Sequence, residues 1–391
     1  MSEHFRKSLL NRLPSLPPTR APWADEPDGQ SEQLDDNEGD DLGDLQPPSA
    51  IRRADQDLSP LSAGDYFDQA LEIHPPGSDT KFRAYTTHAT AVKDKPTVLV
   101  CHHGGGASGL SFATLAKQIK QKSSGELGTL TYDCRGHGKT TSEGGKSRDT
   151  DLSLDTLLSD FLGVITHMYP DPSTAPSLLL LGHSMGAAPI LSAAPVLQQR
   201  GYNVPGVIVL DVVEGTAVEA LPIMKSILAK RPDSFASVVD AIHWHVTSNS
   251  IRNAESARVS VPSFLVPVGI ATADGPPRQV WRTDLLATEP YWAEWYAGLS
   301  SRFLSAKCAR LLVLAGQERL DKELMVGQMQ GKFQLEVMQE VGHYLHEDDP
   351  ATLASTIVTF WRRNTRVLVL PPKIGASGSS GGIAVKKVGE R

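Results

Sequence analysis

The feature that most limits the possible folds is the stretch SLLLLGHSMGAAPI, residues 177–190. Its apolar run is typical of a buried strand, and the sequence that follows is typical of a helix. Ser184 stands between two glycines at the turn, in the pattern G-x-S-x-G. Glycine permits the sharp turn that lifts a serine hydroxyl above a sheet and places it at the start of a helix. The stretch therefore predicts Ser184 as a nucleophile, whereas an ordinary turn would use it only as a capping serine.

Strand and helix patterns alternate along most of the chain. Apolar runs that predict strands are ALEIH, FRAYTT, TVLVCHH, LGTLTYD, SLLLLGH, GVIVLD, ARLLVLAG and FQLEVM, and helical spacing occurs over 113–122, 153–169, 185–201 and 350–364. Ser153 is the expected N-cap of the second helix, and prolines are expected to interrupt the third. Such alternation favours the α/β class: a doubly wound, mostly parallel sheet of the α/β-hydrolase fold, with residues of about 215–305 as a helical cap insertion.

The two ends of the chain differ in composition from the middle. Net charge is −7, and ten acidic residues lie between Asp25 and Asp44, where no Lys or Arg occurs. A segment so poor in large apolar residues buries too little surface to offset its ordering entropy. We therefore expect a disordered acidic and proline-rich arm over 1–60, a hydrolase domain over 61–370 and a disordered Gly/Ser-rich tail over 371–391.

Composition also excludes several function classes. No basic stripe with interleaved aromatics suggests nucleic-acid binding. The three cysteines, Cys101, Cys134 and Cys308, show no spacing typical of a disulfide framework or a zinc cluster, so no metal is expected. No apolar run approaches the ~20 residues of a membrane span, and the N-terminus lacks the apolar core of a signal peptide. A cytoplasmic or nuclear protein without membrane contact is expected.

Two further segments carry groups that a nucleophilic serine needs. His103 is followed by Gly104, Gly105 and Gly106 at the end of an earlier strand. A backbone amide from such a loop, together with the amide of Met185, can bind an oxyanion. We expect Gly105 rather than Gly106 to donate, and His137, in DCRGHG, to be a structural loop residue.

The base and the acid come from later strands. His343 lies just past the last predicted strand, where an imidazole can activate a serine, and is preferred over His346, three residues on. Asp211 and Asp321 both follow strands and both give the order Ser, Asp, His along the chain. The position after the insertion favours Asp321, whereas direct attachment to the end of an apolar run favours Asp211. The pattern alone leaves the two equally placed.

Several longer segments are more specific than these motifs. GHSMG, DVVEGTAVEAL, IRNAESARVS, GQMQGKFQ and VGHYLHEDDP together resemble the protein phosphatase methylesterase family, and the resemblance covers nearly all of residues 80–365. It implies a serine esterase that removes the methyl ester from the C-terminal leucine of the type 2A protein phosphatase catalytic subunit. In that family the triad acid belongs to the DVVEG motif, so the resemblance implies Asp211.

The resemblance makes the expected chemistry concrete. Ser184 attacks the ester carbonyl, His343 carries the proton, Asp211 orients His343, and the amides of Gly105 and Met185 hold the oxyanion, with no cofactor. Methanol is a small leaving group, so specificity must come from the acyl side, a protein C-terminus. A general small-ester carboxylesterase and a phosphatase-binding regulator with secondary catalysis are the alternatives. A further hypothesis is that the triad becomes aligned only when the phosphatase binds.

Overall fold

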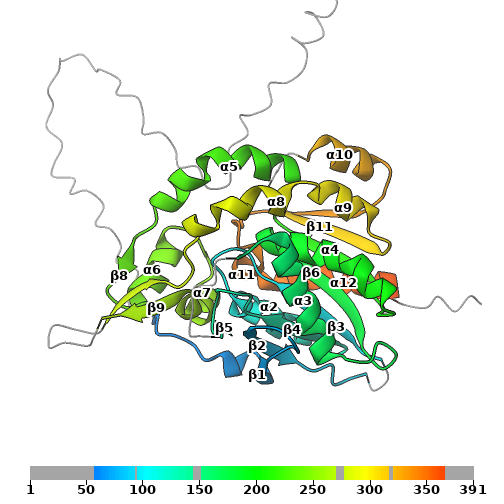
Figure 1. Ribbon diagram of the computed structural model, residues 1–391, viewed down its shortest axis with the longest axis horizontal. Helices are drawn as coiled ribbons and strands as arrows, with labels where there is room; N and C mark the ends of the chain where they lie inside the picture. The colour runs from blue at the N-terminus through cyan, green and yellow to red at the C-terminus, as the bar shows by residue number, and fades with distance from the viewer. Residues whose placement is uncertain (1–56, 93–94, 144–150, 270–276, 317–319, 366–391) are drawn as a thin grey trace, which may run out of the picture.

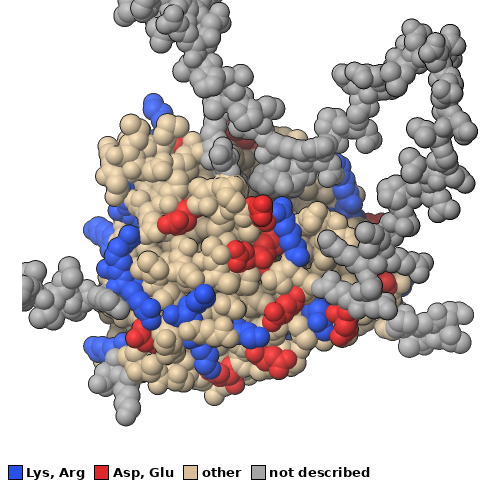
Figure 2. All heavy atoms as spheres, turned by 180° about the vertical axis from the view of Figure 1, so that it is seen from behind, with Lys and Arg blue, Asp and Glu red and all other residues tan. Residues whose placement is uncertain are grey.

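The computed structural model describes residues 57–92, 95–143, 151–269, 277–316 and 320–365. The tail predicted over 371–391 and nearly all of the arm predicted over 1–60 lie outside these ranges. No helix in the described part of the chain combines the length and apolar composition needed to cross a membrane. Basic and acidic side chains lie interspersed on the face shown in Figure 2.

A nine-stranded sheet forms the centre of the fold (Figure 1). Neighbouring strands pair in parallel from β4 through β3, β6, β7 and β11 to β12. At the other edge β1 pairs antiparallel with β2, and β2 pairs antiparallel with β4. The prediction of a mostly parallel sheet is confirmed. In spatial order the strands are β1 (Gln69–Ile73), β2 (Thr80–Thr87), β4 (Leu127–Tyr132), β3 (Thr97–His102), β6 (Ser177–His183), β7 (Gly206–Leu210), β11 (Ala309–Ala315) and β12 (Gln334–Met338), and β5 (Thr141–Ser142) pairs with β2.

Helices cover both faces of this sheet, which explains the unbroken leucine run of β6. Leu178 and Leu180 pack in one core with α3 (Leu154–Met168) and α4 (Ala187–Gln199). Leu179 and Leu181 pack in a second core, on the opposite face, with α2 (Ala113–Lys122) and α12 (Pro350–Thr365). Alternate side chains of a strand point to opposite faces, so a strand buried on both faces must be apolar throughout.

Two local predictions about helices have different outcomes. Ser153 is the N-cap of α3, and its hydroxyl accepts a hydrogen bond from the Thr156 amide at 3.3 Å, as predicted. The prediction that prolines interrupt α4 is wrong, because the helix runs unbroken through Pro189 and Pro195. Pro189 lies in the first turn, where its missing N–H would have no helical acceptor. Pro195 removes one bond from a helix that is buried along most of its length.

The cap, defined here as residues 214–305, joins β7 to β11 and runs along the top and one side of the molecule in Figure 1. Beside its helices it contains a three-stranded sheet in the order β8, β10, β9, which the sequence analysis does not predict. These strands have only two to four residues, too few to show alternation. The cap elements are α5 (Glu214–Ala229), β8 (Ser234–Phe235), α6 (Val238–Thr247), α7 (Ala254–Ser260), β9 (Leu265–Val268), β10 (Arg278–Trp281), α8 (Trp292–Tyr296) and α9 (Leu299–Ser305).

The remaining elements are short. Helix α10 (Lys322–Met329) connects β11 to β12, and α11 (Leu345–Asp348) precedes α12. Single 3-10 turns occur at Ala63–Asp65, Gly109–Phe112, Ser184–Gly186, Val261–Phe264 and Leu286–Tyr291. The Gly-rich loop, Ser184 and Asp211 directly follow β3, β6 and β7, and His343 follows β12 by a few residues. The carboxyl ends of parallel strands share one edge of a sheet, so this topology brings all the predicted site residues to that edge.

Candidate active site

Ser184 occupies a strained turn between β6 and α4. Its φ is +50°, in the left-handed region that side chains rarely adopt. The flanking glycines are required by space: a Cβ on Gly182 would lie 2.6 Å from the Ala187 Cα, and one on Gly186 would lie 2.7 Å from the His103 carbonyl oxygen. The turn therefore has the geometry expected of a nucleophile elbow.

Substitution of Gly182 by alanine tests this geometry. We expect the protein to lose several kcal/mol of stability and nearly all of its esterase activity, because the new methyl group meets backbone atoms that cannot move independently. Thermal unfolding and ester hydrolysis would be measured together. Gly64→Ala is the matched control, since its Cβ would meet only the Ser62 hydroxyl at 3.4 Å. Wild-type stability and activity in Gly182→Ala would contradict the argument.

Asp211 and His343 form the central pair of the site. The His343 Nδ1 and the Asp211 Oδ2 are 2.8 Å apart. The other carboxylate oxygen of Asp211 accepts a hydrogen bond from the Ala315 amide at 2.7 Å, on the neighbouring strand β11. Asp211 is buried, and its φ of +51° lies in the left-handed region that side chains rarely adopt. The two hydrogen bonds therefore fix a carboxylate whose backbone conformation is also restricted. A buried carboxylate on Nδ1 leaves Nε2 of His343 as the nitrogen available to a nucleophile.

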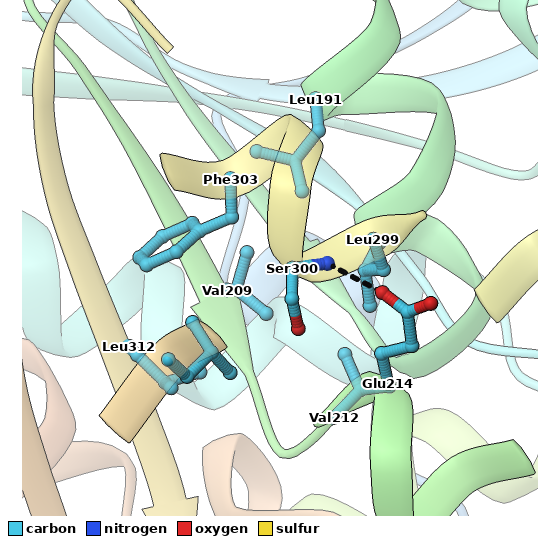
Figure 3. Close-up of a pocket in the computed structure, with 9 residues that line it drawn as sticks. Leu191, Val209, Val212, Glu214, Leu299, Ser300, Phe303 and Leu312 are labelled. Carbon is cyan, nitrogen blue, oxygen red and sulfur yellow. Dashed lines mark hydrogen bonds between the residues drawn. The ribbon is translucent and has the colours of Figure 1, made fainter. Parts of the chain in front are cut away.

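Asp321, the alternative acid, has a different role. Its carboxylate caps α10 by accepting from the Leu324 amide at 2.9 Å, and it also accepts from the Ser300 hydroxyl at 2.5 Å. Glu214 holds the same region by accepting from the Ser300 amide at 3.0 Å, as Figure 3 shows. The small, mainly apolar cavity in that figure is lined by neither Ser184 nor His343. Of the two candidate acids, only Asp211 is paired with His343.

The loop that carries His343 is fixed from two sides. Asp348 accepts hydrogen bonds from the amides of Gly342 and Arg252, at 2.6 and 2.7 Å. On the other side, Nε2 of His183 lies 2.9 Å from the His343 carbonyl oxygen, which can only accept, so His183 donates. His183 therefore links the elbow to the loop of the base. The sequence analysis does not assign a role to His183 or to Asp348, because a backbone partner leaves no sequence signal.

His346, the alternative base, is fully buried below the site. Its ring packs against Phe112 with centroids 4.7 Å apart, and neither of its ring nitrogens has a hydrogen-bond partner among the described residues. Burial lowers the pKa of His346 to about 3. The geometry therefore favours His343 as the base and gives His346 a packing role.

The Gly-rich loop lies directly against the elbow. A Cβ on Gly104 would be 3.2 Å from the Ser184 Cβ. The Gly106 amide donates to Nε2 of His137 at 2.9 Å, so it is already used. In the part of the chain that the structure describes, the Gly105 amide has no acceptor. This arrangement supports the choice of Gly105 over Gly106 as an oxyanion donor, with Met185 at the start of the helix as the other.

His103, Cys134 and His137 form a buried group whose possible ligand atoms lie within 4.8 Å of one another. The ring nitrogens of His103 are bonded to the Gly104 carbonyl and the Cys134 amide, at 2.8 and 2.9 Å. Those of His137 are bonded to the Arg135 carbonyl and the Gly106 amide, at 2.8 and 2.9 Å. A metal would have to displace these backbone bonds, so the group is better explained as support for the Gly-rich loop, in line with the structural role predicted for His137.

The cap brings the Tyr296 hydroxyl to Ser184. Burial raises the pKa of Tyr296 in α8, and a hydrogen bond with Ser184 partly offsets that rise. The neighbouring Trp292 and Trp295 are core residues whose indole N–H groups donate to the Thr288 hydroxyl and the Leu152 carbonyl. Trp292 and Trp295 therefore serve mainly to pack the cap. Arg252 and Arg258 are likewise paired inside the protein, with Asp348 and Asp57.

Comparison with known proteins gives the family. Residues 99–356 match the model of the alpha/beta hydrolase family. "Protein phosphatase methylesterase 1" of Cryptococcus neoformans var. neoformans serotype D (strain JEC21 / ATCC MYA-565) is 59% identical over the full length of both chains. The protein of the same name from Schizosaccharomyces pombe is 43% identical over 80% of this chain and 88% of its own.

Solved structures agree at the level of the fold. E-2-(acetamidomethylene)succinate hydrolase aligns with a TM-score of 0.56 and 18% identity, covering 75% of this chain and 98% of its own. A thioesterase domain from the curacin biosynthetic pathway aligns with a TM-score of 0.53 and 20% identity, covering 74% and 99%. The sheet, the strand-to-helix turn at Ser184 and the full-length relatives lead to one conclusion: the chain belongs to the alpha/beta hydrolase family and, within it, to the protein phosphatase methylesterase 1 family.

Proposed function

We propose that this protein is a serine carboxylesterase that removes the methyl ester from the C-terminal leucine of the catalytic subunit of a type 2A protein phosphatase. The observation that carries the proposal is the 2.8 Å contact between His343 and the buried carboxylate of Asp211, at the sheet edge that also holds Ser184. The relatives, named for methylesterase action on a protein phosphatase, support the substrate class.

The proposed reaction has two halves. Ser184 attacks the ester carbonyl while Nε2 of His343 takes its proton, and Asp211 holds the ring in the tautomer with the proton on Nδ1 and stabilises the imidazolium. The amides of Gly105 and Met185 hold the oxyanion. His343 then protonates the methoxy oxygen and methanol leaves. A water activated by His343 attacks the acyl-enzyme, and the free carboxylate is released with Ser184 restored.

Release of methanol from a carboxymethylated type 2A phosphatase holoenzyme tests this function. We expect stoichiometric release by the intact protein and none by Ser184→Ala, which controls for spontaneous hydrolysis. Simple methyl and p-nitrophenyl esters and a free methylated peptide would be compared at equal concentration. Cleavage of small esters without release from the phosphatase would favour a general carboxylesterase. Tight binding to the phosphatase without release would favour a binding regulator.

A further inference from the structure

Arg231 lies two residues beyond the end of α5 and stacks on an aromatic ring of the cap. Its guanidinium carbon is 3.6 Å from the centre of the Trp281 ring, close enough for a cation–π interaction. The indole N–H of Trp281 donates to the Pro232 carbonyl at 2.7 Å. Trp281 therefore holds both the Arg231 side chain and the backbone beside it, so the guanidinium has a defined position.

Arg231 differs from the other arginines of the cap in its polar contacts. The others bind acceptors: Asp348 for Arg252, Asp57 for Arg258, the Ser234 hydroxyl for Arg278, the Ser263 and Leu265 carbonyls for Arg282, and the Ala297 carbonyl for Arg302. For Arg231 the described residues provide no hydrogen-bond or ion-pair acceptor. Burial lowers the pKa of Arg231, but guanidinium stays charged in proteins. A half-buried guanidinium with no partner among the described residues is free to bind an anionic ligand.

The position of Arg231 connects it to the site. Trp281, the ring beneath Arg231, and Tyr344 pack against the same apolar cluster, and the positive charge of Arg231 opposes the rise that burial causes in the pKa of Tyr344. Tyr344 follows His343 in the chain, and their rings lie 5.8 Å apart. Tyr344 and Trp281 pack against one apolar cluster that also contains Ala107, next to the Gly-rich loop. The cluster therefore connects Trp281, and Arg231 above it, with the loop of His343 and the Gly-rich loop.

We propose that Arg231 is a binding residue for an acidic side chain near the esterified end of the polypeptide substrate. The inference rests on the proposed function. The methoxy group is small, so the polypeptide must extend on the acyl side, and the cap is what it meets there. A carboxylate on guanidinium would form a charge-assisted, bidentate pair over the Trp281 ring. This subsite would select acidic sequences, whereas the triad would cleave any methyl ester that reached it.

The test uses methyl-esterified peptides in which one Asp or Glu is moved a residue at a time from the esterified end, each with an Asn or Gln counterpart. Binding of each peptide would be measured to three full-length proteins that all carry Ser184→Ala, so that no peptide is cleaved. The first keeps Arg231, the second carries Arg231→Gln and the third carries Arg231→Lys. We expect one acidic peptide to bind about 10-fold to 100-fold more weakly to Arg231→Gln, its neutral counterpart to change less than about 2-fold, and Arg231→Lys to be intermediate. Arg278→Gln, on the strand that also carries Trp281, is the matched control.

The outcomes separate this inference from the proposed function. Equal losses for acidic and neutral peptides, or no preference of the parent protein for any acidic peptide, would overturn the role of Arg231. Thermal unfolding of each variant shows whether a common loss reflects a damaged cap. If the preference for acidic peptides disappears in Arg231→Gln, the role of Arg231 is supported, whatever the result for methanol release. If the protein with Ser184 intact then releases no methanol, only the proposed function fails.

Discussion

Replacement of Ser184 by alanine or of Asp211 by asparagine is expected to lower kcat by about 10⁴-fold or more while the protein stays folded. Alanine removes the attacking oxygen. Asparagine keeps an oxygen that can accept from the Ala315 amide, but its amide N–H₂ would face Nδ1 of His343 and favour the tautomer with the proton on Nε2. That tautomer cannot take the Ser184 proton. Single-turnover and steady-state kinetics on a methyl ester would measure both losses.

Asp321→Asn is the control for the acid. Its amide oxygen can still accept from the Leu324 amide, so only the bond to Ser300 is weakened, at a cost of about 1 kcal/mol or less, and the pair at His343 stays intact. We expect kcat within about 3-fold of the parent protein, since nothing at His343 has changed. A large loss in Asp321→Asn with near-normal turnover in Asp211→Asn would reverse the assignment of the acid.

The protein is also expected to unfold in mild acid, because many of its histidines are buried in a neutral state. Burial lowers the pKa of His102, His137 and His245 to about 4 and that of His346 to about 3. It lowers the pKa of His103 and His183 well below the ordinary value. In the unfolded chain all six would titrate near pH 6.5.

The sign of the effect follows from proton binding. Below pH 6.5 the unfolded state gains protons that the folded state cannot take up, so stability present above pH 6.5 is lost as the pH falls. At pH 5.5 each group costs about 1 kcal/mol, or roughly 6 to 8 kcal/mol in all. Burial raises the pKa of Asp133 to about 6, which opposes the loss by about 1 kcal/mol, and it raises the pKa values of Glu347 and Asp348, which act in the same direction. The net loss of unfolding free energy at pH 5.5 is therefore comparable to the total stability of a typical domain.

His346→Phe is the sharpest test of this prediction. Neither ring nitrogen of His346 has a partner in the described part of the chain, so phenylalanine removes one titrating group without breaking a hydrogen bond there. We expect the midpoint of acid unfolding, followed by circular dichroism, to move to lower pH, and the slope of stability against pH to fall by about one proton. His167→Gln, at an exposed position, should change neither. A protein equally stable at pH 7 and pH 5 would contradict the prediction.

The elements that the sequence predicts well depend on neighbours in the chain. Helix α2 has the predicted bounds, and Ser153 caps α3, because spacing and capping act within a few residues. The short strands of the cap and the unbroken helix through Pro195 were not foreseen. Both depend on packing: strands of two to four residues persist only when paired, and burial of α4 outweighs one missing hydrogen bond.

The choice between Asp211 and Asp321 shows why the site needs the tertiary structure. Strands β7 and β11 are neighbours, so an acid after either one stands near the same edge of the sheet. The fold shows that Asp211 pairs with His343, which lies 132 residues later in the chain. Asp321 instead accepts hydrogen bonds from the Ser300 hydroxyl and from the first turn of α10. In the same way, the fold shows that the Gly106 amide already donates to His137. It also shows that His346 is buried, which lowers its pKa to about 3 and makes it a poor base.

By itself, the sequence determined the sheet, the elbow at Ser184 and the set of side chains gathered at its edge, because apolar periodicity and glycine at a strained turn are local properties. The tertiary structure alone brought Asp211 and His343 together, bonded the Gly106 amide to His137 and, among the described residues, left Arg231 without an anionic partner. A hydrogen bond needs atoms within about 3 Å, and segments far apart in the chain reach that distance only through the packing of the whole fold.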